Sequence, residues 1–223
     1  MTVRQVVIIG CGIVGATIAY ELSYVPDLNI TAIDRQLPAQ AATGAALGVL
    51  MGYISQKKEK SRAWRLRSVS MQRYATLLPE LEAQIGAAIP GNPHGILKLC
   101  YPDEDWGKWE KLAATRTRQG FALEQLTPEQ THDLHPQLNC DGIIGAIYSP
   151  HDRQIDPVAL TQALVQAAQN RGVTFHFNAT VTEIETQSDP QSHELLRGIR
   201  LNYHSTDLDR PTIPIDWVVI AAG

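Results

Sequence analysis

The stretch "VVIIGCGIVGATIAYEL", Val6–Leu22, decides the fold. Val6–Ile9 is a short β-branched run, typical of a parallel strand buried on both faces. Gly10–Gly15 then spell G-x-G-x-x-G, and the apolar residues that follow recur at helical spacing. In such a unit the glycines permit a tight turn, the approach of a pyrophosphate, and close packing of helix on strand. The pattern predicts a phosphate at the helix start, and the alternative is a tight turn without a ligand.

A second predicted strand, Asn29–Ile33, ends at Asp34, about 20 residues beyond the third glycine. An acid at this distance is typical of a residue that hydrogen-bonds a ribose hydroxyl, and it disfavours a 2′-phosphate. The neighbouring Arg35 weakens the argument against the 2′-phosphate. The combined pattern predicts a dinucleotide, either FAD or NAD. Cys11 is predicted to be a packing residue rather than a redox thiol.

The composition limits the other functions. The 223 residues carry a formal net charge of −4, which provides no basic surface for nucleic acid. The three cysteines have no paired spacing, so neither a disulfide framework nor a zinc site is predicted. We expect a cytoplasmic protein without a membrane span, since no signal sequence or apolar run of about 20 residues is found.

The segment "RQLPAQAATGAALGVLMG", Arg35–Gly52, is rich in alanine and glycine. Small residues let a backbone lie against a flat ring system. We expect Thr43 to cap a short helix over Gly44–Leu50. A small-residue helix packed on the sheet explains the composition equally well.

Three sets of residues carry a family resemblance. The glycine-rich opening, the Asp34–Arg35 pair and "QAATGAALGVL" (Gln40–Leu50) together resemble the D-amino-acid oxidase superfamily of FAD-dependent amine oxidoreductases, in its glycine oxidase and sarcosine oxidase branch. "GAIYSPHDRQIDPVALTQALVQAAQNRGVTF" (Gly145–Phe175) and "WVVIAAG" (Trp217–Gly223) are similar to later segments of that family. The resemblance covers nearly the whole chain and implies FAD as the cofactor.

The resemblance also implies which residues contact FAD. The pyrophosphate would lie on Gly10, Gly12, Ile13, Val14 and Gly15. The adenosine ribose and its surroundings would be held by Asp34 and Arg35, and adenine by the main chain of Val181. The edge from pyrophosphate to isoalloxazine would be lined by Thr43, Ala45, Ala46, Gly48, Val49 and Leu50. The last segment to pass close to the cofactor would be Ala221, Ala222 and Gly223.

The expected fold class is α/β: a Rossmann-like FAD-binding domain, with a parallel sheet and helices, and an inserted smaller α+β substrate domain, apparently truncated. Residues 1–88 and 153–223 are assigned to the two segments of the FAD-binding domain, and residues 89–152 to part of the substrate domain. A long helix is predicted over Ser61–Gly86, with a core-facing stripe that includes Leu66 and Val69. A further helix is predicted from Asp156 to Arg171.

Two groups of polar residues are further candidate sites. His132 and His135 have no third ligand in sequence reach, so no metal site is predicted. His151–Arg153 lies in a loop near the predicted return to the FAD domain, and we expect that loop to face solvent.

The resemblance implies oxidation of the C–N bond of a small amine or amino acid, of the glycine, sarcosine or D-amino-acid type, to an imine. The family's substrate clamp and catalytic groups are expected beyond Gly223, so the chain is expected to be an N-terminal fragment or a truncated gene product. An NAD-dependent dehydrogenase and a non-catalytic dinucleotide-binding remnant stay as alternatives. The expected partner is a small-molecule substrate rather than nucleic acid, and a homo-oligomer is left open.

Overall fold

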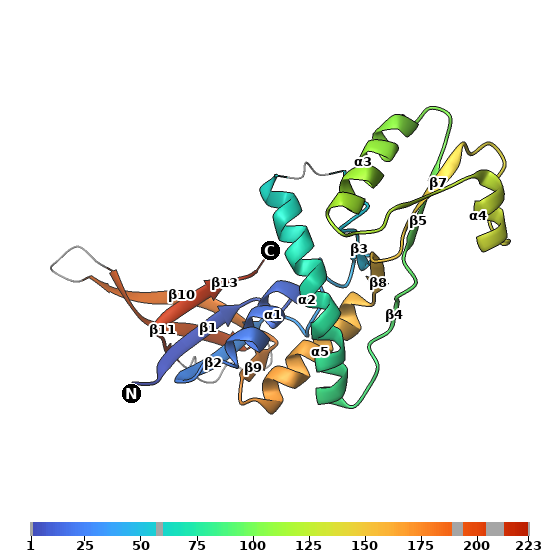
Figure 1. Ribbon diagram of the computed structural model, residues 1–223. Helices are drawn as coiled ribbons and strands as arrows, with labels where there is room; N and C mark the ends of the chain where they lie inside the picture. The colour runs from blue at the N-terminus through green and yellow to red at the C-terminus, as the bar shows by residue number, and fades with distance from the viewer. Residues whose placement is uncertain (1, 57–59, 189–193, 204–211, 223) are drawn as a thin grey trace. The chain divides into compact units, whose positions relative to one another are not determined.

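Residues 2–56, 60–188, 194–203 and 212–222 are described by the computed structural model (Figure 1). Their contacts divide the chain into two units. Unit 1 consists of Met1–Leu47, Glu80–Ile89 and Asp156–Gly223, and unit 2 of Gly48–Pro79 and Pro90–Ile155.

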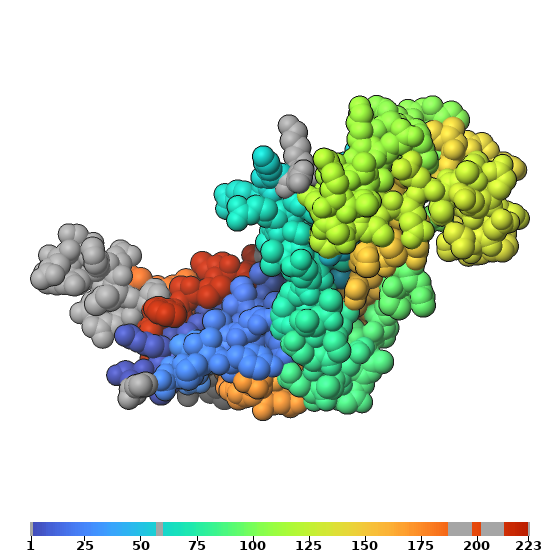
Figure 2. All heavy atoms as spheres, in the orientation of Figure 1, coloured from blue at the N-terminus to red at the C-terminus, as the bar shows by residue number. Residues whose placement is uncertain are grey.

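A four-stranded parallel sheet forms the centre of unit 1. Its strands are β1 (Arg4–Ile9), β2 (Leu28–Asp34), β9 (Thr174–Phe177) and β13 (Trp217–Ile220), in the order β13-β1-β2-β9. Every neighbouring pair is parallel. The first and last strands of the chain therefore lie side by side, as the adjacent blue and red atoms in Figure 2 show. The predicted α/β class with a parallel sheet is confirmed.

Helices α1 (Ile13–Leu22) and α5 (Pro157–Asn170) pack against each other beside this sheet (Figure 1). The start of α5 is as predicted: the Asp156 carboxylate accepts hydrogen bonds from the amides of Val158 and Ala159, and proline occupies the first helical position. After α5 the chain returns to the sheet as β9, parallel to β2, so α5 forms a crossover connection.

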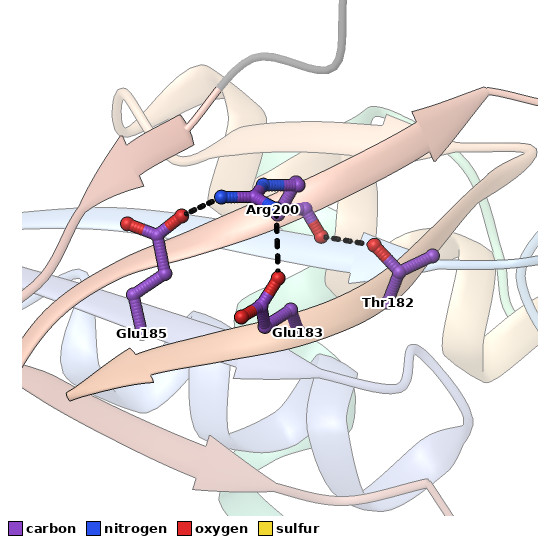
Figure 3. A network of polar contacts seen from close by, with 4 residues as sticks. All are labelled: Thr182, Glu183, Glu185 and Arg200. Carbon is purple, nitrogen blue, oxygen red and sulfur yellow. Dashed lines mark hydrogen bonds and ion pairs between the residues drawn. The ribbon is translucent and has the colours of Figure 1, made fainter.

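An antiparallel sheet of β10 (Ala179–Ser188), β11 (Glu194–Tyr203) and β12 (Thr212–Pro214) packs on the parallel one. Their shared core contains Val7 and Ile33 from the parallel sheet, with Ile199 and Leu201 from β11. On the outside, Arg200 of β11 forms ion pairs with Glu183 and Glu185 of β10 (Figure 3).

Unit 2 contains two small antiparallel sheets. One has the order β5-β7-β6, from β5 (Ile96–Cys100), β7 (Gly145–Ser149) and β6 (Glu124–Leu126). The other has the order β3-β8-β4, from β3 (Val49–Leu50), β8 (Arg153–Ile155) and β4 (Gly91–Asn92).

Unit 2 also contains helices α3 and α4. Helix α3 (Trp106–Arg118) contributes Trp109 and Ala113 to a core with Ile147 of β7. Helix α4 (Pro128–Leu134) begins with a capping box, in which the Thr127 hydroxyl accepts from the Gln130 amide and the Gln130 side chain accepts from the Thr127 amide.

Helix α2 (Arg62–Ile85) begins and ends as predicted. Ser61 accepts a hydrogen bond from the Trp64 amide, and Gly86 follows the helix with a φ of +70°. The predicted core stripe is correct at Leu77 and Leu81, which are buried. It is wrong at Leu66 and Val69, which are 70% and 62% exposed, because periodicity identifies an apolar face but not what covers it.

The unit boundaries bear on the predicted domains. The chain returns to unit 1 at Asp156, close to the expected position 153, whereas Gly48–Pro79 packs with unit 2. The assignment of FAD and substrate binding to particular segments stays a prediction.

Candidate functional site

A cavity of about 530 Å³ lies in unit 1, at the carboxyl ends of β1, β2 and β13. Ligands of open parallel sheets bind at this edge, and the volume is within the usual range for small-molecule sites. The predicted site residues that line it are Gly10, Gly12, Ile13, Val14, Asp34, Arg35, Thr43, Ala46, Val181, Ala221 and Ala222.

The glycine turn, residues 10–15, is packed too tightly for larger residues. Gly10 has a φ of +103°, and a Cβ atom there would lie 2.6 Å from the Ala221 carbonyl. A Cβ atom on Gly15 would lie 1.9 Å from the Gly10 carbonyl oxygen. The first and third glycines therefore let the turn, the helix and the segment after β13 meet.

Asp34 reaches back from the end of β2 to this turn. Its Oδ2 accepts a hydrogen bond from the Cys11 amide at 2.6 Å, and its Oδ1 accepts one from the Gln36 amide at 2.9 Å. The carboxylate is half-buried and lines the cavity, so it retains lone pairs for a hydroxyl donor such as that of a ribose. Asp34 thus fixes the turn while remaining available to a ligand.

Thr43 contacts the start of α1. Its Oγ1 accepts a hydrogen bond from the Ile13 amide at 3.0 Å. The expectation that Thr43 caps its own helix over Gly44–Leu50 is wrong: turns occupy 42–45, and the chain continues into β3. The Thr43 hydroxyl caps α1 instead, through a contact between residues far apart in the sequence.

Cys11 lies fully buried beneath the cavity. Burial, and secondly the negative Asp34 carboxylate, raise the pKa of its thiol from 9.0 to about 12. A thiol is nucleophilic only as the thiolate, so Cys11 has the properties of the predicted packing residue.

Five of the predicted residues that the structure describes do not line the cavity. Gly15 is buried under the turn, where it packs on Gly10. Ala45 is exposed next to the cavity wall. Gly48, Val49 and Leu50 belong to unit 2, and Gly223 lies outside the described residues.

Seven lining residues were missed by the sequence analysis: Ile9, Ile33, Gln36, Ala41, Ala42, Ala179 and Thr180. Ile9 and Ile33 end or nearly end their strands, and the rule that ligands bind at carboxyl ends of parallel strands would have indicated them. Ala179 carried no such signal, since its place depends on how β10 packs over β2.

The loop at 151–153 differs from expectation at its central residue. Asp152 is 0% exposed, and its carboxylate accepts hydrogen bonds from the amides of Gly52, Tyr53 and Ile54 and from the Ser149 hydroxyl. The expected solvent-facing loop is therefore wrong for Asp152. Its side chain organises unit 2 from within.

In the described ranges, no three His, Cys, Asp or Glu side chains gather in a way that suits a metal ion. No helix formed by these residues has both the length and the apolar character needed to span a bilayer.

Comparison with known proteins gives consistent results. The family model described as FAD dependent oxidoreductase (DAO) matches residues 5–223. Mitochondrial dimethylglycine dehydrogenase of Rattus norvegicus is 30% identical over 190 residues, which cover 83% of this chain and 21% of that protein. Glycine oxidase of Geobacillus kaustophilus (strain HTA426) is 27% identical over 219 residues, which cover 98% of this chain and 54% of that protein.

The fold is similar to that of solved structures. The crystal structure of glycine oxidase from Bacillus cereus ATCC 14579 superposes with a TM-score of 0.81 at 22% identity, over 99% of this chain and 55% of that one. The chain thus spans about half the length of the glycine oxidases, and about a fifth of dimethylglycine dehydrogenase.

Proposed function

The chain belongs to the family of FAD dependent oxidoreductases, and we propose that the cavity of unit 1 binds the adenosine diphosphate part of FAD. One observation carries this proposal. The amides of Gly12 and Val14, at the start of α1, have no hydrogen-bond partner among the described residues and line the cavity. Open amides at a helix N-terminus favour an anion such as a pyrophosphate.

The surrounding residues fit the rest of that ligand. Gly12 leaves the turn without a side chain where a phosphate would approach. Asp34 would accept from the ribose hydroxyls, and Val181, which also lines the cavity, would contact adenine through its main chain. The exposed Arg35 would lie beside the ribose.

We further propose that the complete protein oxidises the C–N bond of a small amine or amino acid to an imine. FAD, when bound, supplies the hydride acceptor for such a reaction. Support comes from the relatives, which are named glycine oxidase and dimethylglycine dehydrogenase. Within this chain the residues contribute cofactor binding, and the substrate clamp and catalytic groups are proposed to lie outside it.

We also propose the partners and the compartment of the protein. A small-molecule amine or amino acid is the proposed substrate. The net charge of −4 supports the absence of nucleic-acid binding. Three free cysteines, two of them buried, support a reducing compartment such as the cytoplasm.

The test uses the purified 223-residue chain. It is incubated with FAD or NAD and passed through a desalting column. Bound FAD is measured by its flavin absorbance and bound NAD by the ultraviolet absorbance of the nucleotide released on denaturation. Peroxide release and dye reduction are then measured with glycine, sarcosine, dimethylglycine and D-alanine. We expect bound FAD and little turnover, because the clamp is proposed to be elsewhere.

Each outcome has a defined meaning. Retention of NAD but not FAD by the folded chain would overturn the cofactor proposal. Turnover of any of these substrates at an ordinary rate would overturn the placement of the catalytic groups outside this chain. Circular dichroism of the same sample establishes that the chain is folded.

A further inference from the structure

The segment 39–46 forms one wall of the cavity without regular secondary structure. Four of its residues line the cavity: Ala41, Ala42, Thr43 and Ala46. Its own hydrogen bonds are local, from the amides of Gly44 and Ala45 to the Ala41 carbonyl and from the Ala46 amide to the Thr43 carbonyl. These bonds shape the segment but do not attach it to the sheet.

The Thr43 hydroxyl makes that attachment. Among the described residues, its bond from the Ile13 amide is the one hydrogen bond that joins residues 39–46 to another element. The contact is close: a Cβ atom on Gly12 would lie 3.0 Å from the Thr43 Oγ1. Gly12 therefore makes room for this hydroxyl as well as for a phosphate.

Together with a bond to Asp34, the same bond determines which amides of the turn are open. Asp34 accepts from Cys11 and Thr43 accepts from Ile13, so the protein itself engages these two amides. Gly12 and Val14, which alternate with them in the sequence, keep their donors. The amides of Gly12 and Val14 are thereby the ones left for a phosphate.

We propose that Thr43 is a positioning residue, whose hydroxyl fixes the 39–46 wall to α1 and so sets the pyrophosphate site. This inference rests on the proposed function, since it concerns the same cavity. It assigns to the Thr43 side chain a role distinct from direct contact with the cofactor.

Three variants test the proposal. Thr43→Val keeps the shape but removes the acceptor, and Thr43→Ser restores a hydroxyl. Thr17→Val is the matched control: it removes a hydroxyl from α1 that donates to the Ile13 carbonyl and does not line the cavity. Dissociation constants for FAD, ADP and adenosine are measured by calorimetry, with thermal melting of each variant.

We expect Thr43→Val to bind FAD and ADP about fivefold more weakly, the size expected for loss of one N-cap hydrogen bond. Adenosine has no pyrophosphate, so its affinity should stay unchanged. Thr43→Ser and Thr17→Val should bind all three ligands as the wild type does. The melting temperature of Thr43→Val should fall slightly in either case, because the cap of α1 is lost. A purely structural role would instead weaken the binding of all three ligands together.

Two results separate this inference from the proposed function. If the wild-type chain binds neither FAD nor ADP, the proposed function fails. If the wild type binds both and Thr43→Val binds them equally well or more tightly, the role of Thr43 is wrong. Tighter binding would mean that the freed Ile13 amide serves the phosphate directly.

Discussion

The glycine turn of unit 1 and the segment Gly52–Ser55 of unit 2 both present backbone amides to a carboxylate. In unit 2, Asp152 engages three consecutive amides, and Arg116 donates to the carbonyls of Tyr53 and Ser55. Asp152 and Arg116 are both 0% exposed. In unit 1, the half-buried Asp34 engages one amide of the glycine turn, that of Cys11, and open amides line a cavity.

The difference teaches what separates a binding site from a structural contact. Successive amides favour an anion in either place. Unit 2 supplies that anion from its own chain and leaves no donor for a ligand at residues 52–54. Unit 1 supplies no anion of its own to the amides of Gly12 and Val14, so a ligand has to provide the negative charge.

The largest expected effect comes from removing the anion of unit 2. Asp152→Ala leaves three buried amides without a partner, and we expect a loss of about 4 kcal/mol in the free energy of unfolding, since each such group costs about 1–3 kcal/mol. Three of the four tryptophans, Trp64, Trp106 and Trp109, lie in unit 2 and report its denaturation by urea.

The exposed Asp103→Ala is the control and should change unfolding little. ADP affinity should be unchanged in Asp152→Ala, because the cavity of unit 1 contains none of these residues. A wild-type denaturation curve for Asp152→Ala would show that the amides find other partners, and the comparison would then fail.

Next in size is the effect of filling the glycine turn. Gly15→Ala places a methyl group against the Gly10 carbonyl, and we expect about 3 kcal/mol of destabilisation together with loss of ADP binding. The helical Gly107→Ala is matched in chemistry, but its Cβ atom meets only the Asp105 carboxylate, at 3.3 Å. It should be neutral or slightly stabilising, since alanine favours helices. Equal effects of the two substitutions on urea denaturation would contradict the packing argument.

A smaller effect concerns pH. The unfolded chain releases the Cys11 proton near pH 9.0, whereas the folded chain holds it until about pH 12. The unfolded state thus binds fewer protons in this window, and the free energy of unfolding falls as pH rises through it. Urea denaturation of the wild type between pH 8 and 11 should show a steeper decline than that of Cys11→Ala. Parallel declines would mean that the thiol ionises alike in both states.

The smallest effect is expected at the surface of unit 1. Arg200 pairs with Glu183 and Glu185, and the Thr182 hydroxyl donates to its carbonyl (Figure 3). The Arg200 side chain is 39% exposed, so Arg200→Gln should cost at most about 1 kcal/mol, and less in high salt. A loss comparable to that of Asp152→Ala would mean that exposure does not separate the two kinds of carboxylate contact.

Local patterns in the sequence predicted those parts of the site that are formed by residues close together in the chain. The strand, turn and helix at residues 6–22 and the acid at Asp34 each follow from spacing. The helix starts at Ser61, Thr127 and Asp156 follow from capping chemistry.

Contacts between distant segments could not be predicted in this way. The sequence around Thr43 predicts a cap for the residues that follow it. Its hydroxyl instead accepts from the Ile13 amide, because turns close the 39–46 segment onto the glycine turn. The sequence around Asp152 predicts an exposed polar loop. Its carboxylate instead accepts hydrogen bonds from amides about 100 residues earlier in the chain. In both cases the partner is a backbone amide. Almost every residue has one, so the residue type does not show which amide is the partner.

Competition between FAD and ADP for the purified chain tests the central claim most directly. The claim is that the open amides of the glycine turn bind the pyrophosphate of the cofactor. Equilibrium dialysis should show one FAD bound per folded chain, displaced by ADP and not by riboflavin. Folded chain that retains no FAD, or that retains FAD which riboflavin displaces and ADP does not, would contradict it.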